Sequence, residues 1–201
     1  MWPVLMTLGK IQISIWLLFF GPAVIWASFV LWQKMRNDYT NDEIFSFTLW
    51  LLAAAGLGMM AGKVVGVMAA AAAGWWWCLK KKWDFWELFD FLGIVGLWLW
   101  LLGSLAWGPG AIWEALSATV GIILAWWVRS GYRKFTWYPS GKMGLVGMTG
   151  LLCFCLSQIL VAIFTYVKVY WWGLTVDQLA AAWVVAFTLV AIFLRSGFKH
   201  E

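Results

Sequence analysis

The chain has 201 residues, of which 64% are hydrophobic and only 11% are charged, and its formal net charge is +5. Soluble domains are about 45–50% apolar and about 25% charged, so this composition excludes an ordinary soluble domain. It predicts an all-α fold, in which transmembrane helices form a polytopic bundle and a single integral membrane domain over residues 1–201. Many of the 20 tryptophans lie near the ends of apolar runs, where the lipid–water interface favours amphipathic rings.

Apolar runs follow one another along the whole chain. Seven can be drawn: Ile11–Trp32, Ile44–Gly62, Val64–Leu79, Phe85–Trp107, Ala111–Val128, Met143–Val167 and Leu179–Leu194. Most have about the 17–25 residues that a helix needs to span hydrocarbon. Only Lys63 interrupts residues 44–79, and one helix over that stretch would be about 54 Å long, against about 30 Å of hydrocarbon. We therefore predict a turn at Gly62–Lys63 and seven helices, with six helices, one of them long and tilted, as the alternative.

Polar residues at the ends of these runs predict where several helices begin. Acidic residues stand at the start of the second run, in Asn41–Glu43, and at the start of the fourth run, as Asp84 and Glu87. Negative charge stabilises a helix N-terminus. Thr175–Gln178 has the spacing of a capping box for the last helix. Gly108–Gly110, with a central proline, separates the fourth run from the fifth.

Lysines and arginines are distributed unequally between the two sides of a seven-helix arrangement. Eleven fall on one side: Lys34, Arg36, Lys80, Lys81, Lys82, Arg129, Arg133, Lys134, Lys142, Arg195 and Lys199. Three fall on the other side: Lys10, Lys63 and Lys168. Because the basic side of a membrane protein is normally cytoplasmic, we expect a multi-pass protein of the bacterial plasma (inner) membrane with a cytoplasmic C-terminus. The six-helix alternative leaves the C-terminus on the same side.

The densest basic and aromatic segment is RSGYRKFTWYPSGKMG, residues 129–144. Its Gly141-Lys142 pair lacks the rest of a phosphate-binding loop. Position between two membrane spans explains its composition better than nucleic-acid binding does, so we expect no nucleic-acid partner. The residues that we expect to anchor the chain at the headgroup level are Arg129, Arg133, Lys134, Trp137, Tyr138 and Lys142.

Ionisable residues inside membrane helices are costly, so each one is a candidate functional residue. Lys63 and Glu114 fall at the same membrane face, where they could hold a lipid headgroup or each other. Asp90 is expected to be a structural acid, clustered with Asp84, Glu87 and the lysines of residues 80–82. The polar residues that we expect to form hydrogen bonds between helices are Ser104, Thr119, Ser157 and Gln158.

Metal and cofactor chemistry finds little support in the sequence. The three cysteines, Cys78, Cys153 and Cys155, lie in apolar runs without CxxC or Cys/His spacing, and His200 is the penultimate residue. We therefore expect buried thiols, no metal and no cofactor. A channel or transporter is disfavoured, because the sequence has no charged ring, no run of intramembrane acids and no inverted repeat.

Three segments, in order, resemble the prolipoprotein diacylglyceryl transferases of the bacterial inner membrane. They are NDEIFSFTLWLLAAAGLGMMAGKVVGV, KKKWDFWELFDFLGI and PGAIWEAL. Lys63 stands near the arginine that ends the family's second helix, Asp90 stands at its helical aspartate, and Pro109, Trp113 and Glu114 match its proline–aromatic–glutamate helix start. The likeness covers residues 10–165, and residues 166–201 would be an additional hairpin.

The resemblance implies binding of anionic phospholipid and transfer of its diacylglyceryl group to the cysteine of a lipoprotein precursor. It implies a catalytic role for Glu114 and substrate-binding roles for Lys63 and Trp113. The family's histidine–glycine–glycine motif corresponds to VMAAAAAG, and its arginine and asparagine signature to LLGSLAWG, so those residues are absent here. We therefore expect a divergent relative and leave open whether it is an enzyme. The alternative is a non-catalytic scaffold or accessory subunit that binds other membrane proteins.

Overall fold

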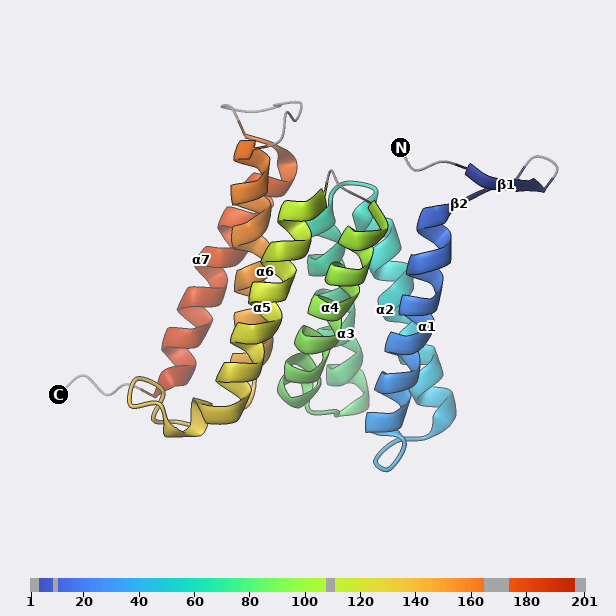
Figure 1. Cartoon of the computed structure of the whole chain (residues 1–201). Coiled ribbons are helices and arrows are strands. Elements are labelled where there is room, and N and C mark those ends of the chain that lie inside the picture. Colours follow the sequence, from blue (N-terminus) through green and yellow to red (C-terminus); the bar gives the residue numbers. More distant parts are fainter. Residues whose placement is uncertain (1–3, 9–10, 108–110, 165–173, 198–201) are drawn as a thin grey trace.

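The computed structural model describes residues 4–8, 11–107, 111–164 and 174–197, and the side chains of residues 20–105, 111–161 and 174–197. This part of the chain contains seven α-helices: α1 Ile15–Met35, α2 Asn41–Met59, α3 Lys63–Lys81, α4 Phe85–Trp107, α5 Ile112–Gly131, α6 Leu145–Phe164 and α7 Val176–Ser196. A 3₁₀ turn, η2 (Tyr132–Lys134), follows α5. The predicted seven-helix, all-α architecture is confirmed (Figure 1).

The first apolar run does not begin as a helix. Strand β1 (Val4–Leu8) pairs in an antiparallel hairpin with β2 (Ile11–Ser14), and only then does α1 begin. The sequence of β2, IQIS, alternates apolar and polar residues. That period of two favours an extended strand over a helix. The prediction of a run starting at Ile11 is therefore corrected by four residues at its N-terminal end, while its C-terminal end extends to Met35.

The turn predicted at Gly62–Lys63 is confirmed, since α2 ends at Met59 and α3 begins at Lys63. Small residues let the two helices approach closely. A Cβ atom placed on Gly58 would lie 2.8 Å from the Cα atom of Gly66, so any side chain there would clash with the backbone of α3. The close hairpin explains how residues 44–79 fit within one membrane thickness.

Successive helices run in opposite directions, and α4 lies between the group α1–α3 and the group α5–α7 (Figure 1). It packs against α1 on one side and against α5 and α6 on the other. The helices α1, α3, α5 and α7 all finish at the same end of the bundle. We call this end the basic end, because it carries Lys34, Lys80–Lys82, Arg129 and Arg195. The other end, where α3, α5 and α7 begin, is called the opposite end.

The outer surface of the bundle is apolar. Large side chains on α5 and α7, including Ile123, Trp127, Phe187 and Leu194, are exposed. Four helices, α2, α4, α5 and α7, are long and apolar enough to cross a membrane, and α6 contributes a shorter apolar segment over Leu145–Val161. Exposed apolar surface on this scale requires a nonpolar solvent. The chain is therefore a multi-pass membrane protein.

Aromatic rings also fill part of the interior at the basic end. Around Trp83 lie the rings of Tyr39, Phe47 and Trp77, with centroid distances of 4.1, 5.3 and 6.3 Å respectively. These rings come from the connection after α1, from α2 and from α3, so they join three elements in one cluster. Some of the aromatic residues thus pack the core instead of lining the lipid–water interface.

Candidate functional site

The structure brings Lys63 and Glu114 together at the opposite end of the bundle. Lys63 is the first residue of α3 and Glu114 lies in the first turn of α5. Lys63 Nζ and Glu114 Oε1 are 2.6 Å apart, which makes a charge-assisted hydrogen bond. The side chain of Glu114 is 15% exposed and that of Lys63 is 48% exposed. The carboxylate is therefore shielded by the protein, while the ammonium group keeps donors for another partner.

A third residue, Asp177 in the first turn of α7, completes this corner and was missed by the sequence analysis. Its carboxylate accepts hydrogen bonds from the backbone nitrogens of Lys63 at 3.1 Å and Val64 at 2.9 Å. It thereby satisfies free amide groups at the start of α3 and places negative charge at a helix N-terminus. One signal pointed to such a partner: α3 has no acid in its first turn, and Gly62 has no side chain to cap it.

The capping box predicted at Thr175–Gln178 is confirmed, and it fixes the position of Asp177. Thr175 Oγ1 accepts from the Gln178 backbone nitrogen at 3.2 Å, and Gln178 Oε1 accepts from the Thr175 backbone nitrogen at 2.9 Å. These reciprocal bonds set the direction in which α7 starts. The carboxylate of Asp177, between them in the sequence, is thus held against α3.

Trp113 lies beside Glu114 in the sequence but is exposed on the surface of α5. Its carbonyl oxygen accepts a hydrogen bond from Ser117 one turn later. Glu114 points instead toward α3, where it meets Lys63. Pro109, which the family resemblance includes, lies outside the described residues.

Asp90, at the basic end, binds backbone amides. Its Oδ2 accepts from the Gly144 nitrogen at 2.7 Å and its Oδ1 from the Gly147 nitrogen at 2.8 Å. This carboxylate caps the start of α6 from α4. Gly147 packs directly on α4, since a Cβ atom on Gly93 would lie 2.7 Å from the Gly147 Cα atom.

The expected clustering of the acids Asp84, Glu87 and Asp90 with the lysines of residues 80–82 is therefore wrong in the part of the chain described. Glu87 pairs with Lys34 at 3.1 Å, and Lys81 pairs with Glu43 at 2.8 Å. Free amides at a helix N-terminus bind Asp90 with fixed geometry, which exposed lysines do not offer.

Arg195, near the end of α7, holds the connection between α5 and α6 in place. Its guanidinium carbon lies 3.8 Å from the centroid of the Trp86 ring, and its Nη2 donates to the Met143 carbonyl at 2.6 Å. Ser140, in the same connection, donates its hydroxyl to the Arg195 carbonyl. Together with Asp90, these contacts attach residues 135–144 to both α4 and α7.

The segment expected to anchor the chain divides between surface and core. Trp137 is 45% exposed and stacks on Phe135 with 5.4 Å between ring centroids. Tyr138 is 0% exposed, and its hydroxyl donates to the Lys142 carbonyl at 3.0 Å. Tyr138 therefore packs inside the bundle, because its phenol finds a backbone acceptor there.

The hydroxyl groups expected to join helices bind their own helices instead. Ser104, Thr119 and Ser157 donate to the carbonyls of Trp100, Ala115 and Phe154, three or four residues earlier. In apolar surroundings the preceding turn offers the nearest acceptor. Gln158 Nε2 is buried and has no hydrogen-bond partner among the described residues. The expectation of interhelical bonds is thus wrong for the three hydroxyls.

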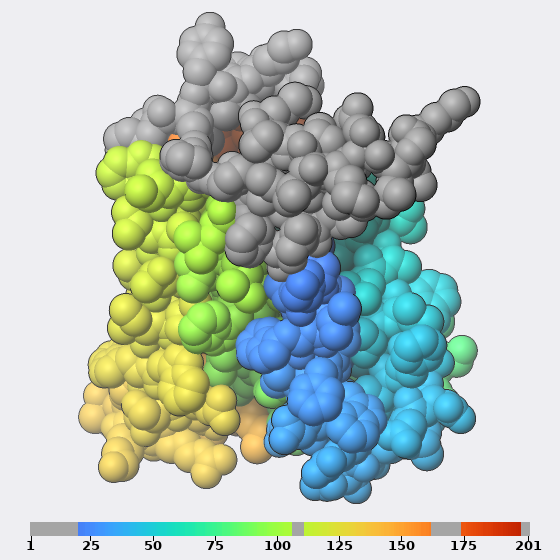
Figure 2. Space-filling view, turned by 45° about the vertical axis from the view of Figure 1, so that its right-hand side comes forward, coloured from blue at the N-terminus to red at the C-terminus, as the bar shows by residue number. Residues whose placement is uncertain are grey.

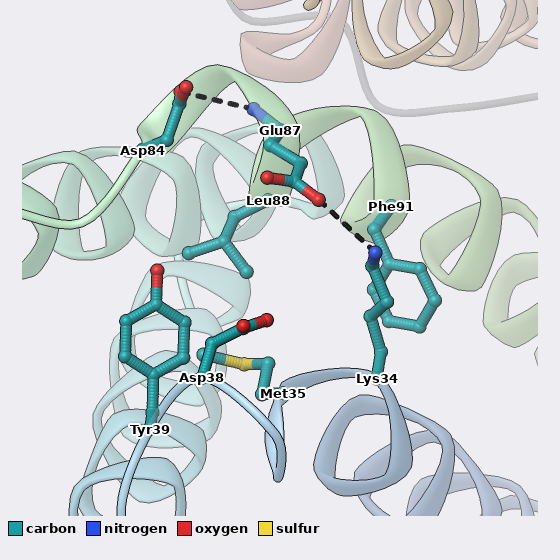
Figure 3. Close-up of a pocket in the computed structure, with 8 residues that line it drawn as sticks. All are labelled: Lys34, Met35, Asp38, Tyr39, Asp84, Glu87, Leu88 and Phe91. Atoms are coloured by element: carbon teal, nitrogen blue, oxygen red, sulfur yellow. Dashed lines mark hydrogen bonds and ion pairs between the residues drawn. The ribbon is translucent and has the colours of Figure 1, made fainter.

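A small notch at the basic end contains three carboxylates, from Asp38, Asp84 and Glu87 (Figure 3). Its volume is about 20 Å³, enough for a single water molecule. Asp84 Oδ1 accepts from the Trp86 and Glu87 backbone nitrogens at 2.9 and 3.3 Å, so it caps α4. Across the described residues, no group of three or more His, Cys, Asp or Glu side chains could hold a metal ion.

No protein-family model matches the chain. No curated protein matches it significantly.

Proposed function

We propose that this membrane protein binds an anionic phospholipid at the corner formed by Lys63 and Glu114, and that it is a divergent relative of the prolipoprotein diacylglyceryl transferases. The observation that supports this most strongly is the 2.6 Å contact between Lys63 Nζ and Glu114 Oε1. These are the two charged residues that the family resemblance assigns to the substrate site, and they are 51 residues apart in the sequence, on α3 and α5. The contact places a cation, Lys63, next to a base, Glu114.

This pair supplies the two groups that diacylglyceryl transfer needs. The half-exposed ammonium group of Lys63 can donate to a lipid phosphate, while Glu114, shielded from solvent, can accept the proton of a cysteine thiol. In the proposed reaction a sulfur–carbon bond forms and the bond between glycerol carbon and phosphate oxygen breaks. Glycerol phosphate leaves with the electron pair, and the thiol proton passes to Glu114.

The proposed orientation places this corner on the outer side of a bacterial inner membrane. Eleven lysines and arginines fall on the basic side and three on the other. This count of basic residues assumes that successive helices run in opposite directions, as they do in Figure 1. The C-terminus of α7, at the basic end, would then be cytoplasmic, and the lipoprotein precursor would approach from outside.

The test is a transfer assay with the purified full-length protein, labelled phosphatidylglycerol and a lipoprotein signal peptide that contains one cysteine. Glu114→Gln keeps the size of the side chain and removes the base, so transfer should fall about 10²–10⁴-fold. Lys63→Met should raise the phospholipid concentration needed for half-maximal rate. Absence of transfer by the wild-type protein rejects the catalytic proposal.

The second candidate is a non-catalytic scaffold or accessory subunit of a membrane complex. It is favoured by Asp177, which joins the same corner and, with Lys63 and Glu114, links α3, α5 and α7. A charge exchange, Lys63→Glu with Glu114→Lys, separates the two candidates because it can restore the ion pair while misplacing the base. A scaffold should recover its thermal stability and its copurifying partner, whereas an enzyme should recover stability without activity.

A further inference from the structure

A larger cavity, of about 450 Å³, opens at the basic end of the bundle. Figure 2 shows it as a recess between α5 and α1, with α4 and the start of α6 behind it. Six charged side chains line it: the cations Lys34, Arg129, Arg133 and Lys134, and the carboxylates Glu87 and Asp90. The cations come from α1, α5 and η2, so only the folded bundle brings them together.

The cavity has a surplus of positive charge, since four cations against two carboxylates leave +2. Both carboxylates are already engaged, Glu87 by Lys34 at 3.1 Å and Asp90 by backbone amides at 2.7 and 2.8 Å. Within the described ranges, Arg129, Arg133 and Lys134 form no ion pair. The guanidinium groups of Arg129 and Arg133 lie over the rings of Trp126 and Tyr132, 5.7 and 5.8 Å from the ring centroids, and these weak contacts do not neutralise their charge. The excess positive charge of the cavity therefore favours binding of an anion from outside the protein.

The inner wall of the same cavity is apolar, with Phe91 and Ile94 from α4 and Val146 from α6. Seven and fourteen residues after Phe91, on the same stripe of α4, Trp98 and Leu105 are 36% and 57% exposed. Figure 2 shows the surface of α4 between α5 and α1, next to the recess. The surface is thus cationic at one end and apolar along its length.

We infer that this cavity binds the phosphate of an anionic phospholipid from the leaflet at the basic end, with its acyl chains lying along α4. A soluble phosphate would contact the cations but leave the exposed apolar surface of α4 uncovered, whereas a phospholipid would contact both. The site lies at the end of the bundle away from Lys63 and Glu114, and it does not depend on the function proposed for that pair.

The experiment measures the thermal unfolding midpoint of the full-length protein in detergent, titrated with phosphatidylglycerol, phosphatidylcholine of the same chains, or inorganic phosphate. Phosphatidylglycerol should raise the midpoint, and the other two should not. Arg133→Gln with Lys134→Gln should weaken the apparent affinity roughly thirtyfold, from about 1 kcal/mol for each cation. The matched control is Lys80→Gln with Lys82→Gln, which removes the same charge from the same end outside the cavity lining.

Three outcomes would overturn the inference. An equal response to phosphatidylcholine would show that the headgroup charge is not recognised. An equal loss of affinity in the Lys80/Lys82 control would show a diffuse charge effect. A shift with inorganic phosphate as large as that with phosphatidylglycerol would assign the site to a soluble anion. If the double variant does not fold, Arg129→Gln replaces it, with an expected loss of about fivefold.

Discussion

The carboxylate of Asp177 reaches across 113 residues of sequence to Val64, whose backbone nitrogen donates to Asp177 Oδ1 at 2.9 Å. This bond ties the start of α7 to the start of α3. It closes the contact between the first and second halves of the chain at the opposite end of the bundle, next to the pair Lys63–Glu114. The candidate site therefore depends on a residue outside the 10–165 range of the family resemblance.

Removing the Asp177 carboxylate should destabilise the bundle. Asp177→Ala leaves two backbone amides at the start of α3 without an acceptor, which should cost about 1–2 kcal/mol of unfolding free energy. Thermal unfolding in detergent measures the loss. Asp42→Ala, in the first turn of α2, is the matched control, because Asp42 makes no hydrogen bond to another helix among the described contacts. An equal loss in both variants would contradict the tertiary role of Asp177.

Helix spacing in the α2–α3 hairpin should depend on Gly58. Its added Cβ atom would lie 2.8 Å from backbone atoms of α3, whereas the same atom on Gly56 would meet nothing within 4 Å. Gly58→Val should therefore lower the unfolding midpoint and Gly56→Val should change it little. The test compares the thermal unfolding midpoints of the two variants under identical detergent conditions. Similar midpoints would show that the hairpin is not closely packed.

The start of α6 should depend on Asp90. Asp90→Ala leaves the amides of Gly144 and Gly147 unsatisfied, at an expected cost of about 1–3 kcal/mol. The control is Glu87→Gln, which removes the exposed pair with Lys34 and should cost little. Hydrogen exchange at the first turn of α6 should accelerate in the Asp90 variant alone. Unchanged exchange there would rule out the capping role.

The orientation of the bundle can be read from single cysteines. The three native cysteines are first replaced by serine. In that background, the cysteine of Lys142→Cys should react with a membrane-impermeant reagent only after the membrane has been permeabilised. A cysteine at Met60, which is exposed at the turn after α2, should react in intact cells. The reverse pattern would invert the topology, and labelling of both sites from one side would contradict the alternation of helices.

Tyr39, in the connection between α1 and α2, should lose its phenol proton at a higher pH than free tyrosine does. Burial, and next the nearby negative charge of Asp38 and Glu87, raise the pKa of its phenol above the ordinary value of 10.0. The stability that depends on the neutral phenol is therefore complete below about pH 10 and is lost as the pH rises through the higher pKa of the folded state. A phenolate absorbance titration of the wild type minus Tyr39→Phe should give a midpoint above that of free tyrosine. A midpoint at or below it would contradict the burial of the phenol.

Much of the architecture follows from local sequence. The length of residues 44–79 predicts the turn before Lys63, and the Thr175–Gln178 spacing predicts the cap of α7, as the structure confirms. Helix boundaries are predictable because a transmembrane helix satisfies its backbone hydrogen bonds within itself. Hydropathy failed at Ile11–Ser14, where a polar–apolar alternation was read as part of a helical run.

Polar partners were harder to predict. The acids at positions 90 and 177 bind amides 54 to 114 residues away, and no local pattern specifies such a distance. Tyr138 was expected at the headgroup level but is buried, because the fold provides the Lys142 carbonyl as an acceptor. The hydroxyls of Ser104 and Ser157 found acceptors on their own helices.

The sequence by itself determined that this chain lies in a membrane and crosses it as a series of apolar helices, since hydrophobicity and chain length act segment by segment. Only the tertiary structure decided that Lys63 meets Glu114, that Asp177 caps α3, and that Arg129 and Arg133 line one cavity with an apolar wall. Those outcomes depend on how helices cross, and a crossing is fixed by packing of small residues such as Gly93 against a neighbour, here Gly147, that is distant in the sequence but close in space.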